Sequence, residues 1–299
     1  MLLRRIALYR TQDVLKIESM ADSVHLNFDN AWATTADIAT RDFLDWGPRL
    51  RYFAPPKLIE TFYYDIVQAL PPFVLYGSGD FHHLAALLIR RFAEPLHVIS
   101  FDNHPDWDVR APYWGCGAWV SRALEINTVE QVSVWGCGNF ELAWPSRWFA
   151  NRKGLQSGKL KVNAWAERQS ESTAKRFDCM TRGNWQDRFL QHAESLKGTN
   201  VYVTVDLDCL REEEAATNWE NGLYTAREIR WAIEQLRSVS NVLGGDVCGA
   251  WSKPVYAGKF QRVAGGWDHP KANVQPRPDG EKINRTSLET IWPALTNGY

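Results

Sequence analysis

The chain contains 299 residues, of which 45% are hydrophobic, and its 34 lysines and arginines nearly balance its 35 aspartates and glutamates. The formal net charge of -1 gives no electrostatic reason to expect binding to nucleic acid or to an anionic membrane surface. A chain of this length fits one large α/β domain or two small ones. Because no shift in composition marks a boundary, we predict a single domain over residues 1–299.

The five cysteines are odd in number and include no Cys-x-x-Cys pair, so the sequence indicates neither a disulfide framework nor a zinc knuckle. Reduced thiols of this kind fit the cytoplasm best. Residues 1–8 lack the sustained apolar stretch and cleavage site of a signal peptide. No apolar run is long enough to cross a membrane. We therefore expect a cytoplasmic protein.

The first thirty residues read as a β-rich appendage. Residues 14–17 and 24–28 alternate polar and apolar side chains, which predicts an edge strand or an appended hairpin. The next convincing element is a helix over residues 56–70. Its proline sits in the first turn, and the pair Pro71–Pro72 ends it.

From residue 73 onward, predicted strands and helices alternate. The strands are expected at residues 73–76, 96–101, 131–135, 160–163, 200–205 and 241–247. The helices are expected at residues 84–92, 118–124, 186–196, 225–236 and 286–295. Thr225 and Glu228 form a capping box at the start of the fourth of these helices. Near-continuous apolar strands that alternate with helices predict an α/β fold with a mainly parallel sheet covered on both faces.

Polar side chains of metal-binding type follow three of these strands. The three clusters are Asp80, His82 and His83; Asp102, His104 and Asp106; and Asp206 with Asp208. Alternate residues of an extended segment point the same way, so each cluster can converge. Because ligand sites of parallel sheets lie beyond the carboxyl ends of the strands, all three clusters should meet at one rim. Carboxylates combined with imidazoles suit a divalent metal such as Mn or Zn.

The first carboxylates of the second and third clusters, Asp102 and Asp206, are placed to bridge two closely spaced cations. Such a pair of cations binds and acidifies a water, which yields hydroxide near neutral pH for attack on a guanidinium, amidine or amide carbon. The alternative is a set of helix caps and buried ion pairs. That alternative is costly, because carboxylates packed together without a cation repel one another.

The order of motifs Gly-x-Gly-Asp-x-His, Asp-x-His-x-Asp and Val-Asp-x-Asp resembles that of the ureohydrolase family, which includes arginase, agmatinase and formiminoglutamase. The motifs span about residues 77–208, and the α/β pattern continues to about residue 250. The resemblance implies a three-layer α/β/α, arginase-like fold and a centre of two manganese ions, with zinc as the alternative metal. By matching position, it implies one ion held by His82, Asp102, Asp106 and Asp206, and the other held by Asp102, His104, Asp206 and Asp208.

The sequence also departs from the family's pattern. Phe81 precedes the pair His82–His83, so either histidine of the pair could be the ligand, with His82 preferred. Arg211 stands where the family's third motif continues to another aspartate. Cys116 and Gly249 stand near the positions of a loop histidine and of the glutamate that grips the guanidinium. The metal-binding part is therefore kept while the parts that recognise arginine are not, which argues against arginase itself.

We therefore predict a binuclear-metal hydrolase that cleaves a non-peptide C–N bond in a guanidino, formimino or amide compound by means of a metal-bridging hydroxide. Asp106 would hold the hydroxide, Asp208 or His83 would pass a proton to the leaving amine, and Asp246 would orient a ligand histidine.

Two alternatives remain open. The pair His82–His83 resembles that of metal-dependent deacetylases, which favours a mononuclear zinc deacylase of acylated amines. The missing substrate residues favour a non-catalytic relative that only binds metal. In each case the expected partner is a small molecule rather than nucleic acid or membrane. The family resemblance also implies that the chain forms a homo-oligomer.

Overall fold

The computed structural model describes residues 22–32, 38–269 and 277–296. Its centre is an eight-stranded sheet in the order β2-β1-β3-β8-β7-β4-β5-β6, and every adjacent pair of strands is parallel. The strands are β1 (Ser23–Asn27), β2 (Thr40–Asp42), β3 (Phe73–Tyr76), β4 (Leu96–Phe101), β5 (Val129–Cys137), β6 (Leu160–Ala164), β7 (Asn200–Asp206) and β8 (Asn241–Cys248).

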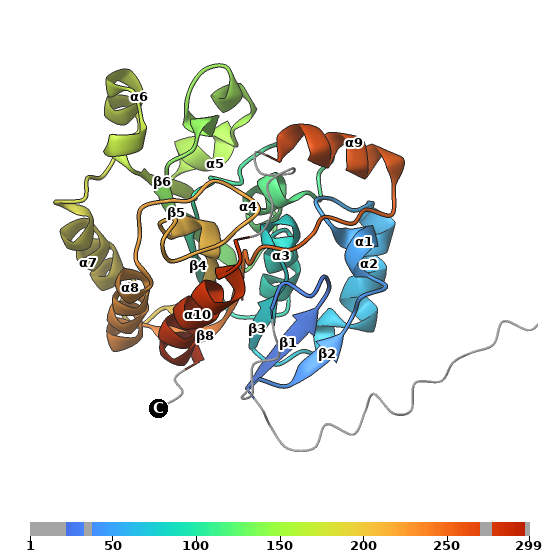
Figure 1. Cartoon of the computed structure of the whole chain (residues 1–299). Helices are drawn as coiled ribbons and strands as arrows, with labels where there is room; N and C mark the ends of the chain where they lie inside the picture. Colours follow the sequence, from blue (N-terminus) through green and yellow to red (C-terminus); the bar gives the residue numbers. More distant parts are fainter. Residues whose placement is uncertain (1–21, 33–37, 270–276, 297–299) are drawn as a thin grey trace, which may run out of the picture.

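Helices cover both faces of this sheet. They are α1 (Gly47–Leu50), α2 (Pro56–Asp65), α3 (Leu84–Ile89), α4 (Trp119–Ala123), α5 (Arg152–Ser157), α6 (Glu171–Arg176), α7 (Trp185–Ser195), α8 (Ala226–Val239), α9 (Lys259–Asp268) and α10 (Gly280–Thr296). Helices α2, α3 and α4 pack into the core on one face, whereas α7, α8 and α10 pack into the core on the other face (Figure 1). The predicted three-layer α/β/α architecture is confirmed. In the part of the chain that the structure describes, no helix is long and apolar enough to span a membrane.

Strand β7 shows why these segments form central strands. Val201, Val203 and Val205 enter the core that contains α7, α8 and α10, whereas Tyr202 enters the core on the opposite face. All of these side chains are buried. A strand that is buried on both faces has no polar side to mark a period of two, which is why it reads as a nearly continuous β-branched run.

The predicted strands from residue 73 onward are confirmed with small changes at their ends. Strand β5 extends two residues further in each direction than the predicted 131–135. The predicted helix 56–70 ends early, since α2 stops at Asp65 and a separate 3-10 turn covers Val67–Ala69. Helix α10 begins at Gly280 rather than at residue 286.

The N-terminal segment differs from the prediction. Strand β1 lies between β2 and β3 and is parallel to both, so it is an internal strand of the sheet rather than an edge strand or half of a hairpin. A hairpin would require β1 to pair in the antiparallel direction with the strand next to it in the sequence. The other predicted strand, at residues 14–17, lies outside the described residues.

The order of the strands decides where the polar clusters meet. Strands β3, β8, β7 and β4 are consecutive neighbours in the middle of the sheet. Since all four are parallel, their carboxyl ends lie at the same edge, although they are far apart in the sequence. The segments that follow β3, β4 and β7 carry the three predicted clusters.

The capping box of α8 offers a test of the local sequence reading. The hydroxyl of Thr225 accepts a hydrogen bond from the amide of Glu228, and the Glu228 carboxylate accepts one from the amide of Thr225. Replacing Thr225 with Ala should lower the free energy of unfolding by about 1 kcal/mol.

Urea denaturation of this variant should be compared with Thr286→Ala. The Thr286 hydroxyl bonds only to a carbonyl of its own helix at an exposed position, so its loss should cost little. An equal loss of stability in the two variants would contradict the role of the capping box.

Candidate metal centre

Six side chains converge at the carboxyl edge of the central strands. They are His82, Asp102, His104, Asp106, Asp206 and Asp208, here called the carboxylate cluster, and all six are buried. They form two groups whose donor atoms lie close enough together to hold a metal ion: His82 with Asp102 and Asp106, and His104 with Asp102 and Asp208. Asp102 belongs to both groups.

The first group surrounds the Nδ1 atom of His82. This nitrogen lies 3.1 Å from Oδ2 of Asp102, 3.4 Å from Oδ2 of Asp106 and 3.6 Å from Oδ2 of Asp206. The second group surrounds Nδ1 of His104, which lies 2.8 Å from Oδ2 of Asp208 and 3.6 Å from Oδ1 of Asp102. The two oxygens of Asp102 therefore face different histidines, as a bridging carboxylate requires.

Backbone amides fix the orientation of these carboxylates. The Oδ1 atoms of Asp102, Asp206 and Asp208 accept hydrogen bonds from amides of the motifs, at 2.7, 3.0 and 3.0 Å. Each Oδ2 atom therefore remains turned toward a histidine. Gly79 allows this close approach, because a Cβ atom at its position would lie 2.7 Å from Oδ2 of Asp206.

Asp106 reaches the cluster by an unusual backbone conformation. Its φ angle is +45°, in the left-handed region that non-glycine residues rarely occupy. Trp119, at the start of α4, donates a hydrogen bond of 2.7 Å from its indole nitrogen to Oδ2 of Asp106. Strained residues of this kind cluster at functional sites.

A chain of hydrogen bonds sets the tautomer of His82. The hydroxyl of Thr204 donates to Oδ1 of Asp246 at 2.7 Å and lies 2.9 Å from Nε2 of His82. Since the single hydroxyl proton of Thr204 points to Asp246, the Thr204 oxygen accepts a hydrogen bond from the Nε2–H group of His82. The Nδ1 atom of the neutral ring then carries a lone pair that faces the carboxylates. Asp246, which the sequence suggested as a group that orients a ligand histidine, reaches the ring of His82 through Thr204.

His104 is held in a comparable way. Its Nδ1 atom faces Asp208, and its Nε2 atom lies 3.3 Å from a carboxylate oxygen of Glu220 in the loop after β7. A polar partner on the far side of the ring is a regular feature of histidines that bind metal, because it fixes the ring and raises its basicity.

The protonation of the cluster reflects its crowding. Burial and the charge of Asp102 raise the pKa of Asp106 to about 7, and burial raises the pKa of Asp208 to about 6 although His104 opposes this shift. Burial and the charge of Asp208 raise the pKa of Asp206 well above its ordinary value. Burial alone would lower the pKa of His104, but Asp208 and Asp102 raise it. Without a metal, protons must therefore neutralise part of the cluster.

The donor atoms fit a divalent cation. Nδ1 of His82 and Oδ2 of Asp102 are buried and make no hydrogen bond, although they lie 3.1 Å apart. Buried polar atoms without a partner are costly, and a cation between them would satisfy both. Carboxylate oxygens with one imidazole for each group suit Mn²⁺ or Zn²⁺.

The structure distinguishes His82 from His83. Neither histidine lines the cavity beside the cluster, but Nδ1 of His82 lies within 3.6 Å of three carboxylates, whereas no hydrogen bond joins the buried ring of His83 to a carboxylate in the described part of the chain. Burial and the neighbouring His82 lower its pKa to about 3. Consecutive residues of a helical turn point about 100° apart, so only one of the two rings can face the carboxylates.

Asp80, from the first predicted cluster, does not join the other carboxylates. Its side chain lies 2.6 Å from Nε of Arg51 and 2.6 Å from Nε2 of His269. Arg51 also contacts Asp29 and Ser252, so this buried network ties together several separate segments beside the cluster. Asp80 therefore supports the surrounding loops.

The three departures from the family pattern have distinct positions. Cys116 lines the cavity, where burial raises the pKa of its thiol well above the ordinary value. Arg211 is half-exposed and forms an ion pair with Glu214. At Gly249, φ is +101° and a Cβ atom would lie 2.1 Å from Oδ1 of Asp206. No side chain fits at that position while Asp206 keeps its place.

Five residues of the cluster, all but His82, form the floor of a cavity of about 430 Å³. Further acidic groups line the walls at Glu141, Glu220 and Asp268, and Tyr52 donates a hydrogen bond of 2.7 Å to Asp268. The ring of Trp219 adds an aromatic wall. These wall residues were not predicted from the sequence, because they lie in segments without recognisable motifs.

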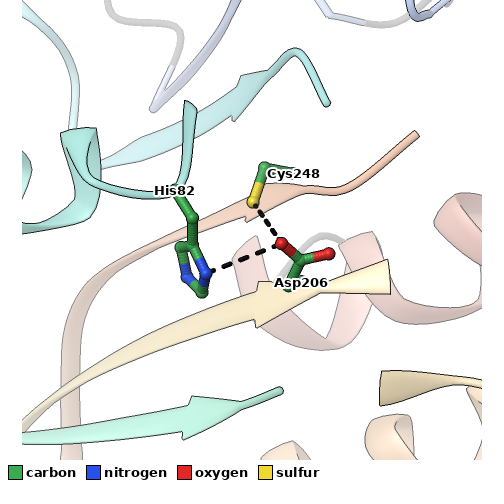
Figure 2. Close-up of side chains that lie close together, drawn as sticks. All are labelled: His82, Asp206 and Cys248. Carbon is green, nitrogen blue, oxygen red and sulfur yellow. Dashed lines mark hydrogen bonds and ion pairs between the residues drawn. The ribbon is translucent and has the colours of Figure 1, made fainter. Parts of the chain in front are cut away.

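One further side chain beside the cluster was not expected. Cys248, the last residue of β8, has its sulfur 3.5 Å from Oδ2 of Asp206, on the side of Asp206 that also contacts His82 (Figure 2). The three predicted clusters do not include Cys248, although Asp246 stands at the alternate position two residues before it on β8.

Comparison with known proteins identifies the relatives of this chain. Residues 13–251 match the sequence pattern of the Arginase family. An uncharacterized protein of Thermotoga maritima is 23% identical over 204 residues, a match that covers 67% of this chain and 66% of that protein. The matched region thus spans slightly less than two thirds of that relative's length.

Solved structures share the fold at low sequence identity. Proclavaminate amidino hydrolase from Streptomyces clavuligerus is 13% identical, with a TM-score of 0.55 over 93% of this chain and 92% of that chain. Formimidoylglutamase from Bacillus subtilis is 13% identical, with a TM-score of 0.53 and coverage of 92% and 86%. Arginase from Bacillus caldovelox is 14% identical, with a TM-score of 0.53 and coverage of 90% and 96%. The predicted arginase-like fold is confirmed.

The bond between Thr204 and His82 can be tested by substitution. Thr204→Val keeps the shape of the side chain but removes the hydroxyl that fixes the tautomer of His82, so metal affinity should fall by roughly ten- to a hundredfold. Thr204→Ser keeps the hydroxyl and should retain the affinity within a few-fold. Competition with a fluorescent chelator would measure both variants, and equal affinities would contradict the role of Thr204.

Metal binding should depend on pH because Asp106 and Asp208 must lose protons to act as ligands. Their pKa values of about 7 and about 6 mean that both carboxyls hold protons as the pH falls through this range. Affinity for Mn²⁺ should therefore fall below about pH 7, and more protons should be released per ion at about pH 6 than at about pH 8. Calorimetric titration in buffers of different ionisation enthalpy measures this number, and the same proton release at both pH values would oppose the prediction.

Proposed function

This chain belongs to the arginase family, and we propose that it is a metal-dependent hydrolase that cleaves a non-peptide C–N bond of a small molecule. The observation that carries the proposal is the division of the carboxylate cluster into two donor groups that share Asp102 at the floor of a cavity. Two groups with a shared carboxylate match the donor arrangement of two-metal hydrolytic sites.

We propose that the cluster holds two divalent cations. His82, Asp102, Asp106 and Asp206 would hold one of them, and Asp102, His104, Asp206 and Asp208 would hold the other. Mn²⁺ is the expected metal from the family and from the carboxylate-rich donors, and Zn²⁺ is the alternative. When bound, the cations would supply Lewis acidity and lower the pKa of water enough to make it a nucleophile.

The remaining steps fall to residues of the chain. Asp106 is held in place by Trp119 and would orient the attacking water. Asp208 lines the cavity and would carry a proton to the leaving nitrogen. The oxygen of the water then bonds to the substrate carbon while the C–N bond breaks. His83, the other proton carrier that the sequence suggested, does not line the cavity, so we assign this step to Asp208.

The cavity favours a cationic or neutral substrate. Glu220 and Asp268 add negative charge to the walls, and the nearby Arg110 is already paired with Asp108. Tyr52 and Trp219 offer aromatic faces, which attract cations. A guanidino or formimino compound fits these walls better than a carboxylate-rich one. Because Gly249 replaces the family's glutamate, the guanidinium of arginine itself would lack its usual partner.

The deacylase alternative receives less support from the geometry. Paired histidines serve as general acid and base only if both reach the substrate. Here the ring of His82 faces carboxylates, and His83 lies buried away from the cavity. A non-catalytic, metal-binding role would show itself as metal binding without turnover of guanidino, formimino or amide compounds.

We propose a cytoplasmic location for this enzyme, from its five free thiols and near-neutral charge. The proposed partner is a small-molecule substrate rather than nucleic acid or membrane. We also propose that the chain forms a homo-oligomer, because members of the family often do.

Metal content is the direct test of the proposed function. The wild-type chain should retain two ions after incubation with Mn²⁺ and removal of free metal. Asp102→Ala and Asp206→Ala should each abolish tight metal binding and lower turnover by at least about a thousandfold, because each removes a carboxylate shared by both ions. Elemental analysis and a screen of guanidino, formimino and amide substrates provide the measurements.

Asp108→Asn is the matched control for metal content. Asp108 belongs to the same loop but pairs with Arg110 instead of joining the cluster, so this variant should keep two ions. Full metal occupancy and activity in Asp102→Ala or Asp206→Ala would refute the proposed centre.

A further inference from the structure

The sulfur of Cys248 points at the metal centre. Asp206 and Cys248 are paired residues at the ends of the neighbouring strands β7 and β8. The Cys248 sulfur lies 3.5 Å from Oδ2 of Asp206, and Nδ1 of His82 lies 3.6 Å from the same oxygen (Figure 2). Nitrogen, oxygen and sulfur all lie within 4.8 Å of one another. Three different donor types thus surround one small volume.

The spacing of these atoms matches the coordination geometry of zinc. Metal–oxygen and metal–sulfur bonds of about 2.0 and about 2.3 Å at a tetrahedral angle separate the two donors by about 3.5 Å. In the structure the Cys248 thiol donates a hydrogen bond of 3.5 Å to Oδ2 of Asp206, so the two atoms have this separation with a proton where the ion would lie. The strands would therefore need little movement to place both atoms around one ion.

The other donors support a site rather than ordinary packing of a cysteine. All three side chains are buried, and Nδ1 of His82 makes no hydrogen bond in the described part of the chain. Its lone pair faces this volume because Thr204 binds the opposite ring nitrogen. At the next residue, Gly249, the chain turns with φ of +101°, which leaves the thiol at the strand end beside Asp206.

The two halves of the centre therefore differ in their donors. The half around His82 has a sulfur within reach, in addition to its carboxylates. The half around His104 is formed by the carboxylates of Asp102 and Asp208 and one imidazole. Thiolate ligands select zinc over manganese, whereas carboxylate oxygens suit manganese.

We propose that Cys248 is a metal ligand and that the centre binds two different ions, Zn²⁺ at the His82 position and Mn²⁺ at the His104 position. This inference rests on the proposed function only in requiring that the cluster bind two divalent cations. Cys248 binds as the thiolate, and its proton passes to solvent when the ion enters. The sulfur of Cys248 takes a position around this ion that an oxygen would otherwise fill, and it makes the His82 half of the centre selective for Zn²⁺ over Mn²⁺.

Cobalt substitution reports on the sulfur directly. Co²⁺ in the wild-type protein should show the near-ultraviolet charge-transfer absorption of a thiolate–cobalt bond, and Cys248→Ser should lose it. Cys116→Ser is the matched control, since Cys116 also lines the cavity but lies outside the three-donor group, and it should keep the absorption. X-ray absorption at the zinc edge of the wild-type protein should show one sulfur at about 2.3 Å, without need of any variant.

Metal preference provides the second readout. Dialysis of the wild-type protein against equal amounts of Zn²⁺ and Mn²⁺ should yield one ion of each per chain. Cys248→Ser should still bind two ions but lose at least about tenfold of its preference for Zn²⁺ over Mn²⁺. Cys248→Ala should behave in the same way, and circular dichroism should confirm that both variants are folded.

The outcomes separate this inference from the proposed function. Two bound ions with no sulfur at the zinc edge, or with an unchanged metal preference in Cys248→Ser, would overturn the role of Cys248 and leave the binuclear hydrolase intact. A wild-type chain that binds no divalent ion would overturn both. If the cobalt absorption were lost in Cys116→Ser but kept in Cys248→Ser, the thiolate ligand would be Cys116 and the proposal would be refuted.

Discussion

The repulsion among four buried aspartates is the constraint on which this part of the structure depends. Asp102, Asp106, Asp206 and Asp208 turn carboxylate oxygens into one volume that excludes most water. Removing an ion from water costs several kcal/mol, and like charges at contact distance add to that cost. Backbone amides offset part of it by fixing one oxygen of three of these carboxylates. Protons or cations must neutralise the rest, and the Nδ1 atoms of two histidines lie beside the carboxylates.

The rigidity of this arrangement comes from the sheet. The ligands follow strands β3, β4 and β7, which together with β8 form the middle of a sheet that is buried on both faces. Positions at the ends of such strands vary little, because each strand is hydrogen-bonded on both sides. The buried pair of Asp80 and Arg51 extends this order to the loops. If the cluster binds metal as proposed, the sheet rather than the ion sets the positions of the ligands.

The carboxylate cluster and the walls of the cavity come from different parts of the fold. The cluster lies at the ends of the central strands, whereas acidic and aromatic side chains of other segments, among them Asp268 and Trp219, line the walls. The close contact between Gly249 and Asp206 excludes a side chain at the position of Gly249. Under the proposed function, the metal chemistry and the choice of substrate would therefore reside in different parts of the fold.

The sequence by itself indicated the strands from residue 73 onward and most helices between them, because apolar runs are local signals. The spacing of polar residues within short motifs, together with the family resemblance, indicated the six residues of the cluster. The sequence did not indicate β2, α1, α5, α6 or α9. Tertiary structure decided the rest. It selected His82 over His83, since two neighbouring residues of a helical turn cannot face the same point. It also brought Thr204, Glu220 and Cys248 to the cluster. These residues carry no local signal, because their positions depend on which strands become neighbours, and the order β3-β8-β7-β4 is set by the packing of the whole sheet.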